Sequence, residues 1–268
     1  MDGFDKLHEE CGVFGIFRRE GEGVLAETYH ALYALQHRGQ ESCGIAVNRD
    51  GVIACHKDVG LVTEVFTSDV LSKLQEGHMA VGHCRYGTTG TLNRENAQPM
   101  LINHRKGAMA VCHNGNLTNA FDLRDELEQQ GAIFHTTSDT EVIAYMLDYL
   151  VRKQGLSWME AANVVAAPFW STIDQLPEEE KARMTLLRKR FPSMLITGPF
   201  SILVGFKGGM MALNDRLKLR SMVVAETEEV AYVASEECAI RRIAPQVEHV
   251  WAPRGGQPVI FTREGGEG

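Results

Sequence analysis

The 268-residue sequence lacks any hydrophobic run near the roughly 20 residues that a membrane-spanning helix needs. It is also poor in basic charge, with 27 Lys and Arg against 35 Asp and Glu and a net charge of −8. Because a phosphate backbone is bound by a basic face, this balance argues against a nucleic-acid partner. Residues 1–10 carry four acids, one Lys and no apolar segment, unlike a secretory signal. We therefore expect a cytoplasmic protein with no membrane or nucleic-acid partner.

The cysteines also lack a familiar spacing. No two of them form a CxxC pair, which excludes the common zinc-ribbon and ferredoxin patterns. In a reducing compartment we expect no disulfides and, for most of these thiols, a role as small buried apolar groups. The sequence predicts no metal site and no cofactor in this chain. The six cysteines are Cys11, Cys43, Cys55, Cys84, Cys112 and Cys238.

What is present is an ordinary globular composition, 44% hydrophobic and 23% charged. The length fits one large domain or two small ones. Apolar runs bounded by turns predict strands in the first and last thirds, and helical spacing predicts helices mainly between them. Antiparallel hairpins with helices grouped between them predict an α+β fold. The expected strands are 11–17, 44–47, 52–56, 79–82, 108–112, 199–206, 210–213, 222–225 and 230–234; the expected helices are 24–37, 120–130 and 138–150, with further helices opening at Ser157 and Pro177.

Three polar residues have the positions of helix caps. Ser138 precedes Glu141 at the spacing of a capping box, in which the serine hydroxyl and the glutamate each accept a backbone N–H. Ser157 and Glu160 repeat that spacing, and Asn119 can cap the helix 120–130. These residues predict where helices begin.

Reactive side chains are concentrated in four short segments at the ends of predicted strands and helices, where chemistry is usually placed. Each segment alone is ordinary, since Asn-Gly is common in turns and Ser-Asp-x-Glu is common at helix starts. Their order along the chain is far more specific. The four segments are 11–15, 82–90, 113–117 and 137–141.

Taken together, these motifs resemble the glutaminase domain of class II glutamine amidotransferases, the N-terminal-nucleophile type. The likeness is nearly continuous over residues 10–150 and is greatest to the domain found in glutamine phosphoribosylpyrophosphate amidotransferases. It becomes weaker after residue 150 and resumes in segments 198–204, 213–220 and 234–237. The motifs that carry it are 10–16, 35–42, 60–66, 82–86, 96–99, 113–117 and 138–142.

The resemblance implies a four-layer αββα sandwich of two antiparallel sheets, the N-terminal nucleophile hydrolase fold. It implies a single glutamine amidotransferase domain over residues 11–268, with a helical insertion at about 156–197. In the family the nucleophilic cysteine is the first residue of the mature chain. Residues 1–10 are therefore expected to be a propeptide that is removed to expose Cys11.

The resemblance also assigns chemistry to Cys11. Its thiol would attack the carboxamide of glutamine, release ammonia and leave a thioester that water hydrolyses. Its own α-amine would be the general base, and an α-amine titrates near pH 7.7–8.0, far closer to neutrality than a lysine. Asn114 and Gly115 match the oxyanion hole of the family, a side-chain amide and a backbone N–H.

Substrate contacts follow from the same resemblance. Arg85 matches the residue that binds the α-carboxylate of glutamine, and Asp139 matches the one that binds its α-ammonium. His83, Tyr86 and Thr88 lie in or beside a segment like the family's mobile glutamine loop, and Arg38 and Gly39 are expected to shape the pocket. In isolation, Arg85 would be a surface cation and Asp139 a helix-start acid.

The favoured function is a free-standing glutaminase that delivers ammonia to a partner synthase. The pattern is similar to the separate amidotransferase subunit of split, archaeal-type glutamate synthases, so the expected acceptor is a flavin-containing glutamate synthase subunit. Three alternatives remain open: a fragment or relative of an amidophosphoribosyltransferase, another amide hydrolase of the N-terminal-nucleophile type, or a non-catalytic subunit that senses glutamine.

Overall fold

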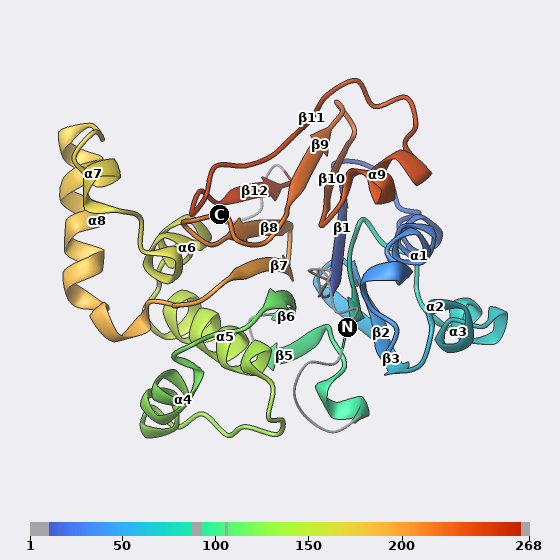
Figure 1. The fold of residues 1–268 in the computed structure, drawn as a ribbon, viewed down its shortest axis with the longest axis horizontal. Coiled ribbons are helices and arrows are strands. Elements are labelled where there is room, and N and C mark those ends of the chain that lie inside the picture. The colour runs from blue at the N-terminus through green and yellow to red at the C-terminus, as the bar shows by residue number, and fades with distance from the viewer. Residues whose placement is uncertain (1–10, 87–92, 105–106, 264–268) are drawn as a thin grey trace, which may run out of the picture.

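A computed structural model describes residues 11–86, 93–104 and 107–263, and within these ranges the strands form two sheets in which every neighbouring pair is antiparallel (Figure 1). The larger sheet has the order β11 (Val250–Trp251), β9 (Val223–Glu226), β10 (Val230–Ala234), β1 (Gly12–Arg18), β4 (Met79–Arg85), β2 (Ser42–Arg49) and β3 (Val52–Val59). The smaller sheet has the order β12 (Val259–Thr262), β8 (Gly209–Asn214), β7 (Phe200–Phe206), β6 (Gly107–Gly115) and β5 (Met100–His104).

Helices cover the outer face of each sheet (Figure 1). The larger sheet is covered by α1 (Leu25–Ala34), α2 (Val62–Val65), α3 (Ser68–Lys73) and α9 (Glu237–Ile243). The smaller sheet is covered by α4 (Ala120–Gln129), α5 (Asp139–Asp148) and α6 (Trp158–Ala166), with α7 (Trp170–Ile173) and α8 (Glu178–Arg190) outside them. This is the predicted α+β fold, a four-layer sandwich, and the prediction is confirmed.

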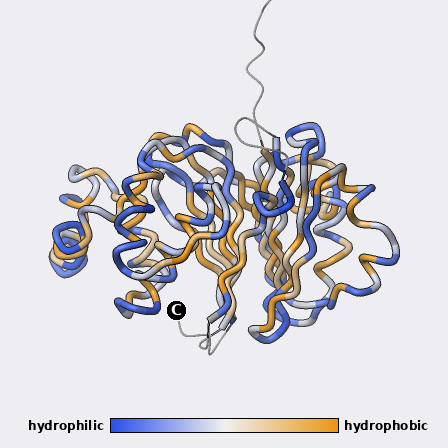
Figure 2. Tube along the Cα trace, turned by 90° about the horizontal axis from the view of Figure 1, so that it is seen from below, coloured by the Kyte–Doolittle hydropathy of each residue, from blue (hydrophilic) through white to orange (hydrophobic). Residues whose placement is uncertain are grey.

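The two sheets pack on each other through a layer of fully buried side chains. Val13 and Phe17 of β1 contribute to this layer, and Leu203 of β7 and Met210 of β8 come from the facing sheet. The alternate residues Phe14 and Ile16 point to the helical side. Because residues 12–17 of β1 are buried on both faces of the sheet, they are apolar without a break. Figure 2 shows hydrophobic residues along the central strands and hydrophilic residues toward the outside.

The helix predicted over 24–37 is shorter in the structure. It ends at Ala34, and residues Gln36–Arg38 form a 3₁₀ turn in which Arg38 donates its N–H to the Leu35 carbonyl at 2.9 Å. The tighter turn changes the direction of the chain and brings Arg38 under the start of β1.

Two of the predicted caps differ from expectation. Ser138 accepts from the Thr140 N–H at 3.2 Å, but Glu141 accepts from the backbone N–H groups of His135 and Thr136 at 3.0 and 2.7 Å, so the predicted capping box is wrong. The loop before α5 folds back over Glu141, so the Glu141 carboxylate accepts from this loop and not from the Ser138 N–H. Asn119 bonds to residues 195 and 197 instead of capping α4, whereas Ser157 and Glu160 do form a capping box.

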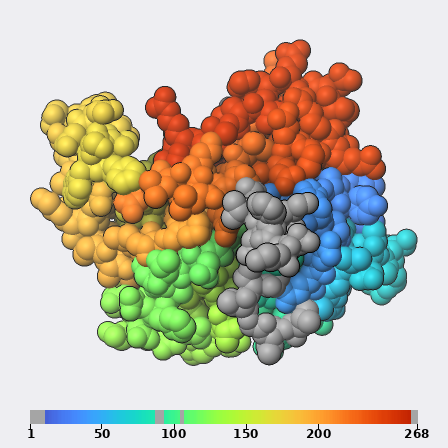
Figure 3. Space-filling view, in the orientation of Figure 1, coloured from blue at the N-terminus to red at the C-terminus, as the bar shows by residue number. Residues whose placement is uncertain are grey.

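Residues 156–197 contain α6, α7 and α8, in agreement with a helical segment. In Figure 3, α7 and α8 form the yellow lobe at the edge of the molecule, away from β1. That this segment is an insertion relative to the family stays a prediction. No helix within the described ranges is both long and apolar enough to cross a bilayer.

Candidate active site

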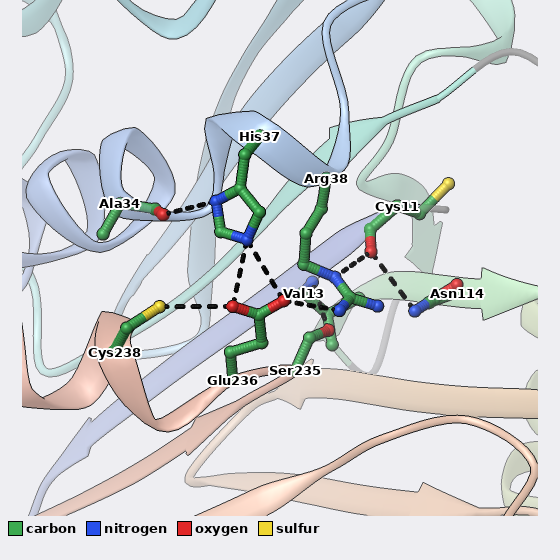
Figure 4. A network of polar contacts seen from close by, with 9 residues as sticks. All are labelled: Cys11, Val13, Ala34, His37, Arg38, Asn114, Ser235, Glu236 and Cys238. Atoms are coloured by element: carbon green, nitrogen blue, oxygen red, sulfur yellow. Dashed lines mark hydrogen bonds and ion pairs between the residues drawn. The ribbon is translucent and has the colours of Figure 1, made fainter. Parts of the chain in front are cut away.

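Cys11 immediately precedes β1, the central strand in the larger sheet's order, and its backbone is held on three sides (Figure 4). Its N–H donates to the Arg38 carbonyl at 2.9 Å. Its carbonyl oxygen accepts from Nε of Arg38 at 2.8 Å and from Nδ2 of Asn114 at 3.3 Å. Its φ of 64° lies in the left-handed region, which is uncommon for a residue with a side chain. An unusual backbone conformation fixed by several contacts is typical of functional sites.

The Cys11 thiol lies beside the end of β4. The Tyr86 N–H points to Sγ at 3.4 Å, and Sγ lies 3.8 Å from the Tyr86 carbonyl oxygen. Figure 4 shows the sulfur directed away from Arg38 and Asn114. The thiol therefore lies at the end of two central strands, before β1 and next to Tyr86, which follows β4.

The other cysteines are poor nucleophiles by comparison. Burial, with the charges of Asp58 and Glu64, raises the pKa of Cys43 to about 12, and burial raises that of Cys55 to about 11. Burial also raises the pKa values of Cys84 and Cys112 far above the ordinary range. The exposed Cys238 has its pKa raised by partial burial and by its contact with Glu236. Since the thiolate is the nucleophile, these shifts count against the five other thiols as nucleophiles.

Asn114 and Gly115 form the end of β6 and pair with Ser201 and Phe200 of β7, so they are strand residues and not a turn. The Asn114 side chain is fully buried, and its Oδ1 has no partner among the described residues. Gly115 has a φ of 149°, and a Cβ there would lie 2.1 Å from the Pro199 carbonyl oxygen. Only glycine fits this position.

Two buried side chains, Gln98 and His83, form hydrogen bonds with the backbone of His113 near the end of β6. Gln98 accepts the His113 N–H at 2.6 Å and donates to the His113 carbonyl at 3.1 Å. His83 donates from Nε2 to the same carbonyl at 3.1 Å. His83 is fully buried, so in this structure it supports the site from within; its predicted contact with substrate stays a prediction.

Asp139 is the first residue of α5 and lies beside the end of β6. It accepts the Leu117 N–H at 2.9 Å, and its other oxygen lies 3.4 Å from Nδ1 of His113. Burial alone would raise the pKa of Asp139, but the nearby His113 and the hydrogen bonds from His113, Leu117 and Thr140 outweigh it, and the pKa lies below its usual value. Asp139 is therefore ionised at neutral pH and able to face a cation.

Arg85 ends β4 and contacts a carboxylate. Its Nη1 lies 3.3 Å from Oε1 of Glu41, and the two side chains are 15% and 13% exposed. The Glu41 N–H also donates to the Arg85 carbonyl at 3.0 Å. Gly39 packs against the same strand, since a Cβ there would lie 2.6 Å from the Cys84 carbonyl atoms. The glycine allows the 3₁₀ turn that carries Arg38 to approach β4.

The structure thus brings Arg38, Tyr86 and Asn114 into contact with Cys11. Arg85 directly precedes Tyr86, and Asp139 contacts His113, which directly precedes Asn114. Thr88 lies outside the described residues. Among those described, no group of three or more His, Cys, Asp or Glu side chains could hold a metal ion.

Three residues that contact this set or the neighbouring His113 are not singled out by sequence reasoning: Glu41, Gln98 and Glu236. Each lies inside a segment that carries the family resemblance, and this is the signal that could have found them.

Comparisons with known proteins identify the proteins that this chain resembles. The glutamine amidotransferase domain family matches residues 83–191. The chain is 39% identical to an amidophosphoribosyltransferase from Synechocystis sp. over 97% of this chain and 47% of the relative. It is 36% identical to one from Staphylococcus epidermidis over 99% of this chain and 47% of the relative. Among solved structures, it resembles glutamine phosphoribosylpyrophosphate amidotransferase from B. subtilis, with a TM-score of 0.73 and 32% identity over 95% of this chain and 48% of that chain.

The fold and these matches show that the chain contains a class II glutamine amidotransferase domain. It is homologous to the glutaminase domain of amidophosphoribosyltransferase. The chain spans about half the length of the curated relatives that it matches.

The buried His83 predicts a specific pH dependence of stability. Burial lowers the pKa of His83 to about 3, although the hydrogen bond to the His113 carbonyl works in the opposite direction. The unfolded chain binds this proton near pH 6.5 and the folded chain does not, so the folded state loses about 1.4 kcal/mol per pH unit from this group as the pH falls from about 6 to about 3. His83→Gln should make the free energy of unfolding fall less steeply over this range. Parallel curves from chemical denaturation would contradict this assignment.

Proposed function

We propose that this domain hydrolyses L-glutamine to L-glutamate and ammonia, with Cys11 as the nucleophile. The observation that carries the proposal is the hold on Cys11, whose carbonyl is bonded by Arg38 and Asn114 while its thiol lies beside the backbone of Tyr86. A residue held this firmly presents its thiol in one direction.

The reaction follows from this placement. The α-amine of Cys11 takes the thiol proton, the sulfur forms a bond to the carboxamide carbon of glutamine, and negative charge develops on the carbonyl oxygen, where donors from Asn114 and Gly115 stabilise it. The C–N bond then breaks, and the α-ammonium of Cys11 gives its proton to the departing nitrogen, which leaves as ammonia. Water, deprotonated by the same amine, adds to the thioester; the C–S bond breaks to release glutamate, and the ammonium returns a proton to the sulfur, which restores the thiol.

Substrate orientation comes from the two charged side chains that flank the nucleophile. The planar guanidinium of Arg85 can hold the α-carboxylate of glutamine, and the ionised Asp139 can hold its α-ammonium. Arg85 lies against Glu41, and Asp139 against His113 and Leu117, so both side chains are oriented before the substrate arrives.

The mechanism requires a free α-amine at Cys11, so the active form should lack residues 1–10. Intact mass spectrometry of the active protein should therefore show a chain that begins at Cys11. Cys11→Ser, which keeps the shape of the side chain but has a poorer nucleophile, is the matched control and should be almost inactive. An active chain that retains all ten residues would contradict the mechanism.

Substitutions at the flanking residues should separate binding from chemistry. Arg85→Lys keeps the charge but loses the planar fork, and Asp139→Asn loses the charge; each should raise KM for glutamine roughly 10- to 100-fold. Asn114→Ala should instead lower kcat by about 10²- to 10³-fold, since its contact strengthens as the oxyanion forms.

Steady-state glutamate release measures all three variants. Arg241→Lys, in the surface ion pair of Arg241 and Glu237 on α9, is the control for an arginine exchange. If Arg85→Lys and Asp139→Asn leave KM unchanged, glutamine is not held as proposed and another amide substrate becomes the better hypothesis.

The ammonia should pass to a partner synthase. The sequence pattern favours a flavin-containing glutamate synthase subunit that aminates 2-oxoglutarate. The names of the relatives favour a second acceptor, phosphoribosyl pyrophosphate. Purification of the protein from its own cells, with its partners attached, should yield a flavin-containing complex whose glutamine consumption rises with 2-oxoglutarate. Stimulation by phosphoribosyl pyrophosphate instead would assign the second acceptor.

A further inference from the structure

The Arg38 side chain forms hydrogen bonds with both Cys11, the proposed nucleophile, and the carboxylate of Glu236. Its side chain is only 3% exposed. Nε donates to the Cys11 carbonyl at 2.8 Å, and Nη1 donates to Oε1 of Glu236 at 2.7 Å (Figure 4). Two edges of one rigid planar group are thus used, one toward Cys11 and one toward Glu236. A change at Glu236 is transmitted to Cys11 through a group that cannot bend.

The Glu236 carboxylate contacts Arg38 and does not cap α9, the helix that follows it. It occupies the cap position of α9, yet its carboxylate caps no backbone N–H there. It accepts instead from Arg38, from Nε2 of His37 at 3.0 Å and from the Cys238 thiol at 3.3 Å. Partial burial would raise the pKa of Glu236, but the hydrogen bonds from Arg38, His37 and Cys238 and the charge of Arg38 lower it below its usual value. Glu236 is therefore an anion at neutral pH.

The residue before Glu236 fixes its position relative to β1. The Val13 N–H donates to the Ser235 hydroxyl at 3.0 Å, and the Ser235 N–H donates to the Val13 carbonyl at 3.0 Å. Ser235 is almost fully buried, at 1% exposed. The segment after β10 is therefore fastened to the same strand that carries Cys11, so Glu236 and Cys11 keep a constant separation.

We propose that Glu236 is a positioning residue for the nucleophile, which acts by holding the Arg38 guanidinium against the Cys11 carbonyl. The proposal rests on the proposed function, in which Cys11 is the attacking group. Fixing the carbonyl fixes the plane of the Cys11–Gly12 peptide and the position of the α-carbon that carries the amine and the side chain. The Tyr86 N–H, 3.4 Å from Sγ, then restricts the direction of the thiol. Glu236 touches none of the reacting atoms; its effect is on the fraction of Cys11 conformers aligned for attack.

The test compares Glu236→Gln with Glu237→Gln. Glutamine keeps the shape but removes the charge that orients Arg38, so kcat for glutamine hydrolysis should fall about 10- to 100-fold while KM changes less than about threefold. Glu237 is the adjacent acid, paired only on the surface of α9 with Arg241 at 2.9 Å in the described structure, and its variant should match the wild type. Glu236→Asp keeps the charge on a shorter side chain and should recover part of the lost kcat.

The outcomes separate this proposal from the proposed function. A wild-type protein that lacks glutaminase activity overturns the proposed function itself. An active wild type with Glu236→Gln at full kcat overturns only the role of Glu236, as does a loss that appears equally in Glu237→Gln or entirely in KM. If Glu236→Gln keeps residues 1–10, the comparison is repeated on chains released at Cys11 from a cleavable N-terminal fusion, so that removal of the segment and turnover are measured apart.

Discussion

The rest of the site depends on the two hydrogen bonds that the Cys11 carbonyl oxygen accepts. The oxygen accepts from Arg38, which follows α1, and from Asn114, which ends a strand of the opposite sheet. Arg38 reaches Cys11 because α1 packs on the larger sheet, and Asn114 cannot reach it unless the two sheets are packed face to face. The apolar layer that contains Val13, Phe17 and Met210 is therefore a condition for the chemistry as well as for stability. A loosened sheet interface would move Asn114 before it unfolded the chain.

The charged side chains around the Cys11 carbonyl contact groups of opposite charge or hydrogen-bond donors. The cation of Arg38 faces the Glu236 carboxylate, and Arg85 faces Glu41. Asp139 accepts from Leu117 and lies against His113. Ionic side chains that are already oriented by neighbours lose less conformational entropy when a zwitterion such as glutamine binds. Some polar atoms near the site are nevertheless buried without a hydrogen-bond partner in the described part of the chain, among them Asn114 Oδ1, Glu41 Oε2 and His113 Nε2.

The apolar pattern of the sequence predicts the α+β class and most strands of this fold, and the family resemblance implies its four layers. Alternating apolar runs located most strands of both sheets, because a strand buried on one or both faces has a distinctive period. Short edge strands such as β5 and β11 were missed because few of their side chains are buried. The Glu141 cap was wrong because a loop five residues away supplied better placed donors. Contacts such as Arg38 to Glu236 join residues 198 positions apart and have no local pattern. The segments that contain Arg38 and Glu236 can be recognised in the sequence, but the contact between the two side chains depends on tertiary packing.

The central claim is that Cys11, and no other thiol, forms a covalent intermediate with glutamine. Protein mixed with isotopically labelled glutamine, quenched in acid during turnover and digested, can be mapped peptide by peptide across all six cysteines. We expect a γ-glutamyl thioester on a peptide that begins with Cys11. A labelled adduct on Cys55 or Cys238, or full turnover with no adduct on Cys11 when thioester hydrolysis is made slow, would contradict the account.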